Sequence, residues 1–366
     1  MSQSATQPVV AVLGATGLVG QKLIALLEKR RFPLSRLKPL ASQRTAGQQI
    51  QFAGQSVEVE EACPEAFEGV DLVLASAGGA ISQALVHQAV ARGAVVVDNT
   101  SCFRMHPDVP LVVAGVNNEA LDAHNGVIAN PNCSTAQLMP VLKALMPLGG
   151  GLQRVVVSTY QSVSGAGKEA IDELRQKSKL AVDCAPGEYP TGYACFARPM
   201  AFNLIPHIDV FMEEAPYQGY TKEEWKLIVE TRKILDLPQL PITATAVRVP
   251  VMVGHSESVT VDFNQPVSLD EVTAALRAAD DVVLSDGLTD YPTPLETEGT
   301  DPVYVGRLRR DASNPEAGVS MWVVADNLMI GAALNAVRLA EALVARGLVT
   351  PRSQCAHLFE PAAATA

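Results

Sequence analysis

The first residues of the chain carry the feature that most limits how it can fold. A continuous apolar run, Val9–Leu13, leads into the glycine-rich turn Gly14-Ala15-Thr16-Gly17-Leu18-Val19-Gly20, and apolar residues at helical spacing follow at Leu23, Leu26 and Leu27. An apolar run, a tight turn and an amphipathic segment in this order predict a strand, a turn and a helix. The sequence therefore predicts a βαβ unit at the beginning of the chain.

Short apolar runs alternate with helical patterns, such as Ile81–Val90, through the first third of the chain. Such alternation predicts a parallel, doubly wound sheet. We therefore expect an α/β, Rossmann-like domain over residues 1–132. Its further predicted strands are Val70–Leu74, Ala94–Val97, Leu111–Val113 and Val127–Ala129.

Longer strands with fewer helices predict a second, α+β domain over residues 133–326. Ser268 and Glu271 have the spacing of a capping box. The stretch Val182–Pro206 has no clear periodicity and is predicted to be a long ordered loop, and residues 349–366 a frayed tail. The predicted strands are Arg154–Tyr160, Thr243–Val249, Ser258–Phe263 and Val319–Val324, and the predicted helices include Lys222–Leu235 and Leu328–Ala345.

Composition narrows the possible partners. The 366 residues are 48% hydrophobic, enough for two cores, and the net charge of -11 disfavours binding to nucleic acid or an anionic membrane. No apolar run reaches the roughly 18 residues of a membrane span, and the polar start lacks signal-peptide features, so a cytoplasmic protein is expected. Six scattered cysteines, among them Cys355, form no C-x-x-C pair, which favours reduced thiols and no metal site.

The glycine turn is a candidate nucleotide site, because backbone N–H groups at a helix N-terminus can face a pyrophosphate. The alternative is a turn needed for packing alone. NAD-binding folds usually place an acidic residue about 20 positions later. Here Ala41–Gly47 supplies Ser42, Arg44 and Thr45, which suit the 2′-phosphate of NADP unless Arg44 is a solvated loop residue. Ser76-Ala77-Gly78-Gly79 is a second possible cradle.

Cys133 is the candidate nucleophile. It lies in Asn130-Pro131-Asn132-Cys133-Ser134-Thr135, where a predicted strand ends and an apolar helical pattern begins. A helix N-terminus favours the thiolate, the form that attacks a carbonyl carbon. The alternative is that Cys133 is a small buried hydrophobic residue.

This hexamer resembles the active-site signature of the aspartate-semialdehyde dehydrogenase family. Further motifs resemble the family in the same order and extend the resemblance from about residue 8 to residue 348. They are GATGLVG, ASQRTAG, QSVSGAG at Gln161–Gly167, GYTKEEWK at Gly219–Lys226 and RVPVMVGHSES at Arg248–Ser258.

The resemblance implies roles for three catalytic residues. Cys133 would be the covalent nucleophile and His255 its acid–base partner, since histidine titrates near neutral pH. Gln161 would orient the acyl group and donate toward the developing oxyanion. Without the family, Gln161 is a polar residue at a strand end and His255 a core or surface histidine.

The resemblance also assigns the substrate's charged groups. Arg248 would pair with its carboxylate, Glu223 with its ammonium group, and Arg104 and Lys226 with its phosphate, near Asn132. Lys226 otherwise reads as part of a solvated helix face.

The same resemblance implies contacts to the nicotinamide and a partner subunit. The first come from Ser164, Gly165, Gly167 and Asn327. A homodimer is expected, with a tetramer as an alternative, and the helix within residues 327–348 should return to the nucleotide domain.

The implied reaction is NADP-dependent reduction of 4-phospho-L-aspartate to aspartate 4-semialdehyde with release of phosphate, through a thioacyl enzyme. The resemblance places it in lysine, threonine, methionine and diaminopimelate biosynthesis. Two alternatives stay open: an N-acetyl-γ-glutamyl-phosphate reductase, against which Glu223 argues because an acetylated amine needs no acidic partner, and a catalytically silent, dinucleotide-binding paralogue.

Overall fold

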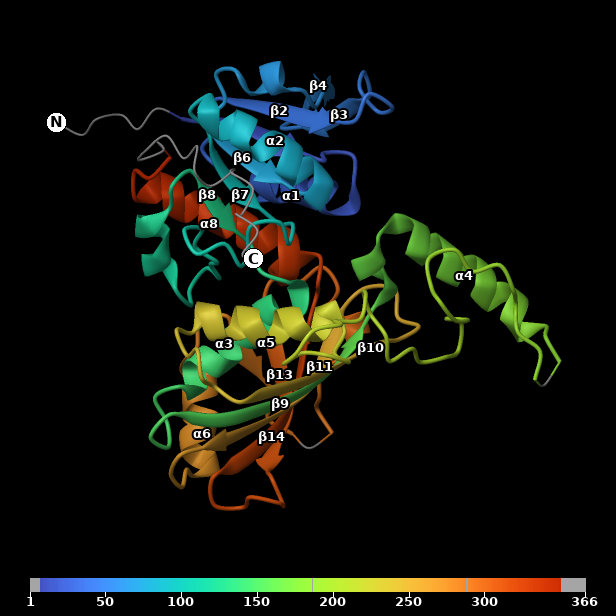
Figure 1. Cartoon of the computed structure of the whole chain (residues 1–366), viewed down its shortest axis with the longest axis vertical. Helices are drawn as coiled ribbons and strands as arrows, with labels where there is room; N and C mark the ends of the chain where they lie inside the picture. Colours follow the sequence, from blue (N-terminus) through green and yellow to red (C-terminus); the bar gives the residue numbers. More distant parts are fainter. Residues whose placement is uncertain (1–6, 186, 288, 350–366) are drawn as a thin grey trace. The chain divides into compact units, whose positions relative to one another are not determined.

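The computed structural model describes residues 7–185, 187–287 and 289–349. The chain forms two compact units: the first runs to Pro131 and resumes at Ala332, and the second spans Asn132–Gly331. Each unit has its own six-stranded sheet (Figure 1). Cys355 and all of the predicted tail except Val349 lie outside the described residues.

The sheet of the first unit is parallel throughout, in the order β5-β2-β1-β6-β7-β8. Every residue of β6 and β7 is buried, as expected for a sheet covered on both faces. The predicted doubly wound sheet is confirmed. Its strands are β1 (Val9–Leu13), β2 (Arg36–Ala41), β5 (Glu60–Glu61), β6 (Leu72–Ala75), β7 (Val95–Asp98) and β8 (Val127–Ala129).

Helix α8, the last among the described residues, belongs to the first unit and packs on α1 and β7. Arg30, the C-cap of α1, forms a fork with Glu341 on α8, with both nitrogen–oxygen distances at 2.8 Å. The π-helical turn η4 (Met329–Ala333) precedes α8, so the α-helix begins later than the predicted Leu328. The other elements here are α1 (Leu18–Lys29), α2 (Gly79–Ala91), α8 (Leu334–Ala345), η1 (Pro64–Phe67), η2 (Asn118–Ala123) and the hairpin β3 (Gln49–Phe52) and β4 (Gln55–Glu58).

The predicted strand Leu111–Val113 is wrong. Only Leu111 forms a bridge, to Ala129. The Val112 N–H still donates to the Ala129 carbonyl at 3.1 Å, but other backbone groups of the segment bond to side chains. Asn117 accepts from the Val113 N–H and donates to the Leu111 carbonyl, and Asn335 donates to the carbonyl of Val112. Two asparagine side chains thus replace the ladder that a strand would need.

The sheet of the second unit is mixed, in the order β10-β9-β11-β14-β13-β12. The helices α3, α5 and α6 form one layer on it (Figure 1). Along β9, buried positions alternate with half-buried ones from Val155 to Gln161, so one face is covered more completely than the other. The strands are β9 (Leu152–Gln161), β10 (Ile242–Arg248), β11 (His255–Phe263), β12 (Val282–Leu284), β13 (Val303–Arg310) and β14 (Gly318–Ala325).

The helices of the second unit are α3 (Cys133–Leu145), α4 (Lys168–Val182), α5 (Lys222–Ile234), α6 (Leu269–Ala278), and the short α7 (Pro294–Thr297) and η3 (Val163–Ala166). The predicted capping box of Ser268 and Glu271 is present. In the predicted loop 182–206, the described residues after α4 form neither helix nor strand. Among all described residues, no helix is long and apolar enough to span a membrane.

Candidate active site

Strand register brings three of the predicted site residues into one row. Gln161, the last residue of β9, pairs with Arg248 at the end of β10 and with His255 at the start of β11. Residues directly opposite on neighbouring strands present their side chains to the same face of the sheet. All three are buried, so the row is formed by residues that are far apart in the sequence and shielded from water.

Cys133 is the first residue of α3, and Asn132 is its N-cap, whose Oδ1 accepts from the Ser134 N–H at 3.0 Å. The thiol therefore lies at the positive end of the helix, which stabilises a thiolate. Gly331 lies against it: a Cβ there would be 2.5 Å from the Cys133 Cβ. Glycine is thus required at position 331 for the backbone to approach the nucleophile.

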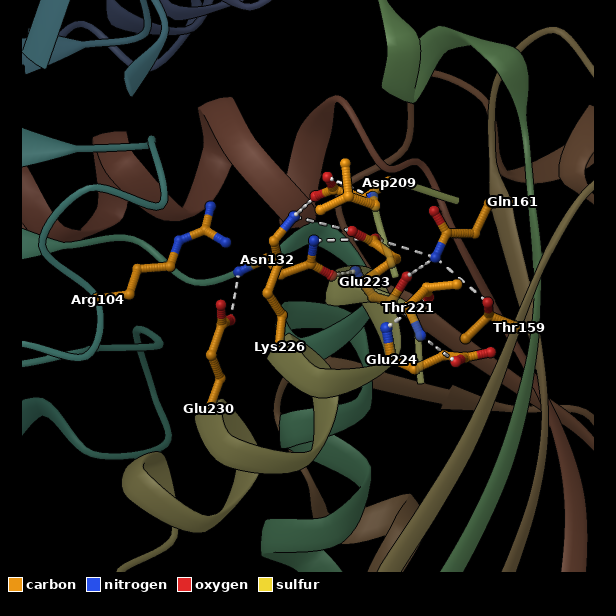
Figure 2. A network of polar contacts seen from close by, with 12 residues as sticks. Arg104, Asn132, Thr159, Gln161, Asp209, Thr221, Glu223, Glu224, Lys226 and Glu230 are labelled. Atoms are coloured by element: carbon orange, nitrogen blue, oxygen red, sulfur yellow. Dashed lines mark hydrogen bonds and ion pairs between the residues drawn. The ribbon is translucent and has the colours of Figure 1, made fainter. Parts of the chain in front are cut away.

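Asn132 is held from three directions (Figure 2). Besides capping α3, its backbone N–H donates to Glu230 at 2.7 Å and its Nδ2 donates to Glu223 at 3.0 Å. Both carboxylates come from α5, at positions seven residues apart on one helical face. Helix α5 therefore fixes the residue that precedes the nucleophile.

His255 is fully buried, and its two ring nitrogens differ in environment. Nδ1 accepts the Ser162 backbone N–H at 3.1 Å. A backbone N–H can only donate, so the neutral ring carries its proton on Nε2. Among the described residues, Nε2 has no hydrogen-bond partner. Burial, aided by the charge of Arg248, lowers the pKa of His255 to about 3.

Glu223 lies at the centre of the polar network in Figure 2. It accepts from Asn132, from Gln161 at 3.1 Å and from Lys226 at 3.2 Å. Burial alone would raise the pKa of Glu223, but Lys226, these hydrogen bonds and Arg248 outweigh it and hold the pKa below its ordinary value. A carboxylate has about four acceptor sites, so an ionised Glu223 retains room for one more donor.

Lys226 bonds to Asp209 at 2.7 Å as well as to Glu223. Burial alone would lower the pKa of Lys226, but the two carboxylates raise it above its ordinary value. Counting partners among the described residues, two of the three ammonium donors are thus used, and one is left for an anion.

Gln161 and Arg248 bind the neighbouring backbone and side chains. Gln161 Nε2 donates to the Ser134 hydroxyl at 2.8 Å, and Arg248 Nη1 donates to the Ser162 carbonyl at 2.7 Å. Burial lowers the pKa of Arg248, against the opposing charges of Glu223 and Cys133. Arg248 is therefore a buried cation close to both the thiol and the carboxylate.

Asn327 connects the loop after β9 with the loop before β11. Its Oδ1 accepts from the Gly254 N–H at 2.9 Å and from the hydroxyls of Ser162 and Ser164, each at 3.1 Å. Gly165 lies above His255, where a Cβ would be 3.5 Å from the ring. Gly167 follows with a left-handed φ of 99°. The predicted cofactor residues Ser164, Gly165 and Asn327 thus lie around the loop whose Ser162 bonds to His255, and Gly167 is the C-cap of the turn η3 in that loop.

The nucleotide-loop residues belong to the first unit and lie at the carboxyl ends of β1, β2 and β6. The strand order reverses beside β1, which is where ligands bind in open α/β sheets. Gly17 and Gly78 cap α1 and α2 without a side-chain hydrogen bond, so the first N–H groups of both helices stay open to a phosphate. Gly20 packs against the turn: a Cβ there would be 2.1 Å from the Gly14 carbonyl oxygen.

The other predicted nucleotide residues cluster on these loops. Thr16 and Thr45 hydroxyls lie 3.4 Å apart, which joins the glycine turn to the loop of Ser42 and Arg44. Ser76 follows β6, and its backbone N–H donates to the Leu13 carbonyl at 2.8 Å. Ala15 is buried, whereas Leu18 and Val19 are half-buried at the start of α1.

Arg104 belongs to the first unit, and hydrogen bonds to backbone carbonyls fix the orientation of its guanidinium group. Its Nε donates to the Asn130 carbonyl and its Nη2 to the Asn99 carbonyl, both at 2.8 Å. Asp98, the residue before Asn99, accepts hydrogen bonds from the hydroxyls of Thr100 and Ser82 and so fixes this turn. Burial raises the pKa of Asp98.

Sequence reasoning missed several residues of this site. Glu230 could have been found, because it continues the helical stripe of Glu223 and Lys226. Asp209 and Gly331 carry no local signal. Among the described residues, no cluster of three or more histidine, cysteine, aspartate or glutamate side chains could hold a metal ion.

Comparisons with known proteins identify the family of the chain. Family models described as semialdehyde dehydrogenase, NAD binding domain, and semialdehyde dehydrogenase, dimerisation domain, match residues 9–124 and 142–330. The aspartate-semialdehyde dehydrogenase of Bacillus subtilis is 45% identical over 346 residues, which cover 93% of this chain and 98% of that protein.

Solved structures are similar over the same length. The crystal structure of aspartate semialdehyde dehydrogenase II from Vibrio cholerae complexed with ASA has a TM-score of 0.87 and 43% identity, and covers 93% of this chain and 99% of that one. Aspartate semialdehyde dehydrogenase with NADP from Candida albicans has a TM-score of 0.71 and 26% identity, with 94% and 100% covered. The chain belongs to the aspartate-semialdehyde dehydrogenase family.

Proposed function

We propose that this protein reduces 4-phospho-L-aspartate to aspartate 4-semialdehyde with NADPH and releases phosphate. The observation that carries the proposal is the position of Cys133 at the N-terminus of α3, in the same unit as the buried row of Arg248, Gln161 and His255. A thiolate, an amide donor, an imidazole N–H and a cation are the groups that acyl transfer through a thioester requires.

Covalent catalysis divides the reaction into two steps. The Cys133 thiolate attacks the acyl carbon, the bond from carbon to the phosphate oxygen breaks, and a thioacyl enzyme remains. The Nε2–H of His255 would donate toward the acyl oxygen while negative charge develops on it, and Gln161 would do so by releasing its bond to Ser134 or to Glu223. Once the thioacyl carbon has gained a hydride, the hemithioacetal anion collapses: its C–O⁻ becomes the aldehyde carbonyl, the C–S bond breaks, and the Cys133 thiolate is released.

The cofactor would be NADP, which supplies the hydride when bound. The uncapped N-termini of α1 and α2 suit its pyrophosphate. Ser42 and Arg44 are exposed at the end of β2, where a 2′-phosphate would find a hydroxyl and a guanidinium. Ser164, Gly165, Gly167 and Asn327 would contact the nicotinamide.

Glu223 supports a substrate with a free amine. Its lowered pKa keeps the buried carboxylate ionised, and one acceptor site is left for an ammonium group. Arg248 would bind the substrate carboxylate, and Arg104 and Lys226 would bind the phosphate with Asn132. An N-acetylated substrate would leave Glu223 without a partner, so the reductase alternative is disfavoured.

The test follows nicotinamide absorbance in the oxidative direction. The protein is given phosphate and either NADP or NAD, with aspartate semialdehyde or, separately, N-acetylglutamate semialdehyde. We expect phosphate-dependent turnover of the first aldehyde with NADP. Turnover of the second aldehyde alone would move the protein to the alternative reductase, and binding of NADP without turnover of either would leave a nucleotide-binding paralogue.

The second unit also supports a homodimer. The matching family model is named for dimerisation, and the sheet face opposite α3, α5 and α6 carries half-buried Tyr160 and Trp322, whose rings lie 5.3 Å apart. A cavity of about 420 Å³ opens beside them, lined by Ser258, Arg307 and Met321 among others. We propose that a second copy of the chain packs on this face.

The substitution Ser158→Arg tests this interface. Ser158 lies in the middle of β9, opposite Ser258, and is half-buried. A charge buried between two copies would weaken the dimer by at least about 100-fold in Kd. Sedimentation equilibrium measures this, with Gln153→Arg at an exposed position of the same strand as the control. A dimer of unchanged affinity in the Ser158 variant would locate the interface elsewhere.

A further inference from the structure

Glu257 is a buried carboxyl group that the proposed mechanism does not use. It follows His255 by two residues on β11, so the two side chains share the sheet face that α3 covers. Its side chain is fully buried, and among the described residues neither carboxyl oxygen has a conventional hydrogen-bond donor. Burial raises the pKa of Glu257 well above its ordinary value.

The neighbours of Glu257 offer no counter-charge. Thr159 on β9 and Val323 on β14 lie directly opposite in the sheet, and neither titrates. His255 shares the same face and is neutral, because its pKa is about 3. The side chain that reaches Glu257 from α3 is Gln137, which is also uncharged.

Gln137 lies one helical turn after Cys133 and has one end already occupied. Its Nε2 donates to the backbone carbonyl of His255 at 3.4 Å. Its second amide hydrogen serves a hydrogen bond to Glu257, which lowers the pKa of that carboxyl group, although burial is the larger effect and raises it. The Oε1 of Gln137 is buried and, among the described residues, lacks a conventional donor. A protonated carboxyl group can pair with a carboxamide through two hydrogen bonds, because it accepts the amide N–H and its hydroxyl donates to the amide oxygen.

We propose that Glu257 is a neutral carboxylic acid whose hydroxyl donates to Gln137 Oε1, and that it thereby holds the start of α3 against β11. Gln137 then bonds to both Glu257 and the backbone of His255. Cys133 lies on the same helical face as Gln137, four residues earlier. Glu257 is thus a positioning residue that aligns the nucleophile with the histidine, a role that rests on the proposed function.

The protonation state of Glu257 can be measured in the absence of substrate. The infrared difference spectrum between wild type and Glu257→Gln at pH 7 to 8 should contain the carbonyl band of a protonated carboxylic acid, contributed by the wild type. A carboxylate band in its place would show that Glu257 is ionised, which would overturn the proposal.

The pH dependence of folding stability gives a second test of whether Glu257 is protonated. A carboxyl group with a raised pKa in the native state binds a proton that the unfolded chain has already lost. The wild-type folding constant should therefore fall, relative to that of Glu257→Gln, by up to about tenfold per pH unit above the ordinary carboxyl pKa. A ratio that is independent of pH, or that changes in the opposite direction, would contradict a neutral Glu257.

Kinetics test the positioning role. Glu257→Gln retains an uncharged N–H donor, so we expect kcat within about threefold of wild type. Glu257→Leu has no donor, and kcat should fall at least about tenfold with an unchanged KM for NADP. Gln137→Leu should have the same effect, and the double variant should be no worse than either single one.

Each result decides one claim. Additive losses in the double variant, or a Gln variant as poor as the Leu variant, would reject the positioning role. A protein with the carboxylic-acid band that turns over neither aldehyde would keep the neutral Glu257 and reject the proposed function.

Discussion

Replacing Cys133 with alanine is expected to lower phosphate-dependent turnover of aspartate semialdehyde by at least about 10⁴-fold, because no thioacyl enzyme can form. Alanine is smaller than cysteine and keeps the helical start of α3, with Asn132 still capping it. Binding of NADP should therefore be unchanged. Nicotinamide absorbance measures the first quantity and titration of the nucleotide measures the second.

The matched control is Cys63→Ala, a half-buried cysteine of the first unit. It should retain wild-type turnover and thermal stability. An aldehyde-derived or alkylating label should be found by peptide mass on Cys133 of the control and not at position 133 of the Cys133 variant. Residual turnover above about one hundredth of wild type in Cys133→Ala would mean that another group carries the chemistry.

His255→Gln is expected to lower kcat by about 10²- to 10⁴-fold, the range for losing a group that assists proton transfer. Glutamine keeps an N–H near the position of Nε2, so it retains part of the donation to the oxyanion. His255→Ala removes the donor as well and should be the slower enzyme. Equal losses in the two variants would show that donation from Nε2 contributes nothing measurable.

The tautomer of His255 can be observed directly. Since Nδ1 accepts the Ser162 N–H, nitrogen NMR of labelled histidine should find Nε2 protonated and Nδ1 bare in the substrate-free protein. The signal is assigned by its absence from His255→Gln. A ring with the opposite tautomer, or one charged at neutral pH, would contradict the geometry of the Ser162 contact.

The same histidine should make the protein sensitive to acid. Its native pKa of about 3 lies below the ordinary 6.5, so below pH 6.5 the unfolded state binds a proton that the native state does not. The contribution of His255 to stability is therefore fully present above pH 6.5 and is lost as the pH falls toward 3. The folding constant decreases by up to about tenfold per pH unit in this range. His255→Gln should remove this part of the acid dependence.

Local sequence patterns predicted several elements of the fold correctly. The predicted strand Val9–Leu13 coincides with β1, and the capping box of Ser268 and Glu271 is formed as its spacing indicates. Both depend on neighbours within a few residues, which is the range that periodicity and capping record. The same reasoning did not predict β2, whose segment Arg36–Ala41 mixes charged residues and a proline with its apolar ones.

Where side chains compete for the backbone, local pattern misleads. The apolar segment Leu111–Val113 has the pattern of a strand, yet Asn117 and Asn335 bond to two of its carbonyls and to the Val113 N–H, and Asn335 lies more than two hundred residues away. The helix predicted from Leu328 instead begins with a π turn, which contains Gly331, the residue that lies against Cys133. In the first case a distant side chain takes part in deciding the local conformation.

The sequence by itself determined the parallel opening sheet, the change to a second domain and, through motif resemblance, the residue types proposed to act in the site. Only the tertiary structure decided the row of Arg248, Gln161 and His255, because strand register depends on packing between distant segments. It alone also decided the protonation states of His255 and Glu257. Those states follow from burial and hydrogen-bond partners, which no run of neighbouring residues specifies.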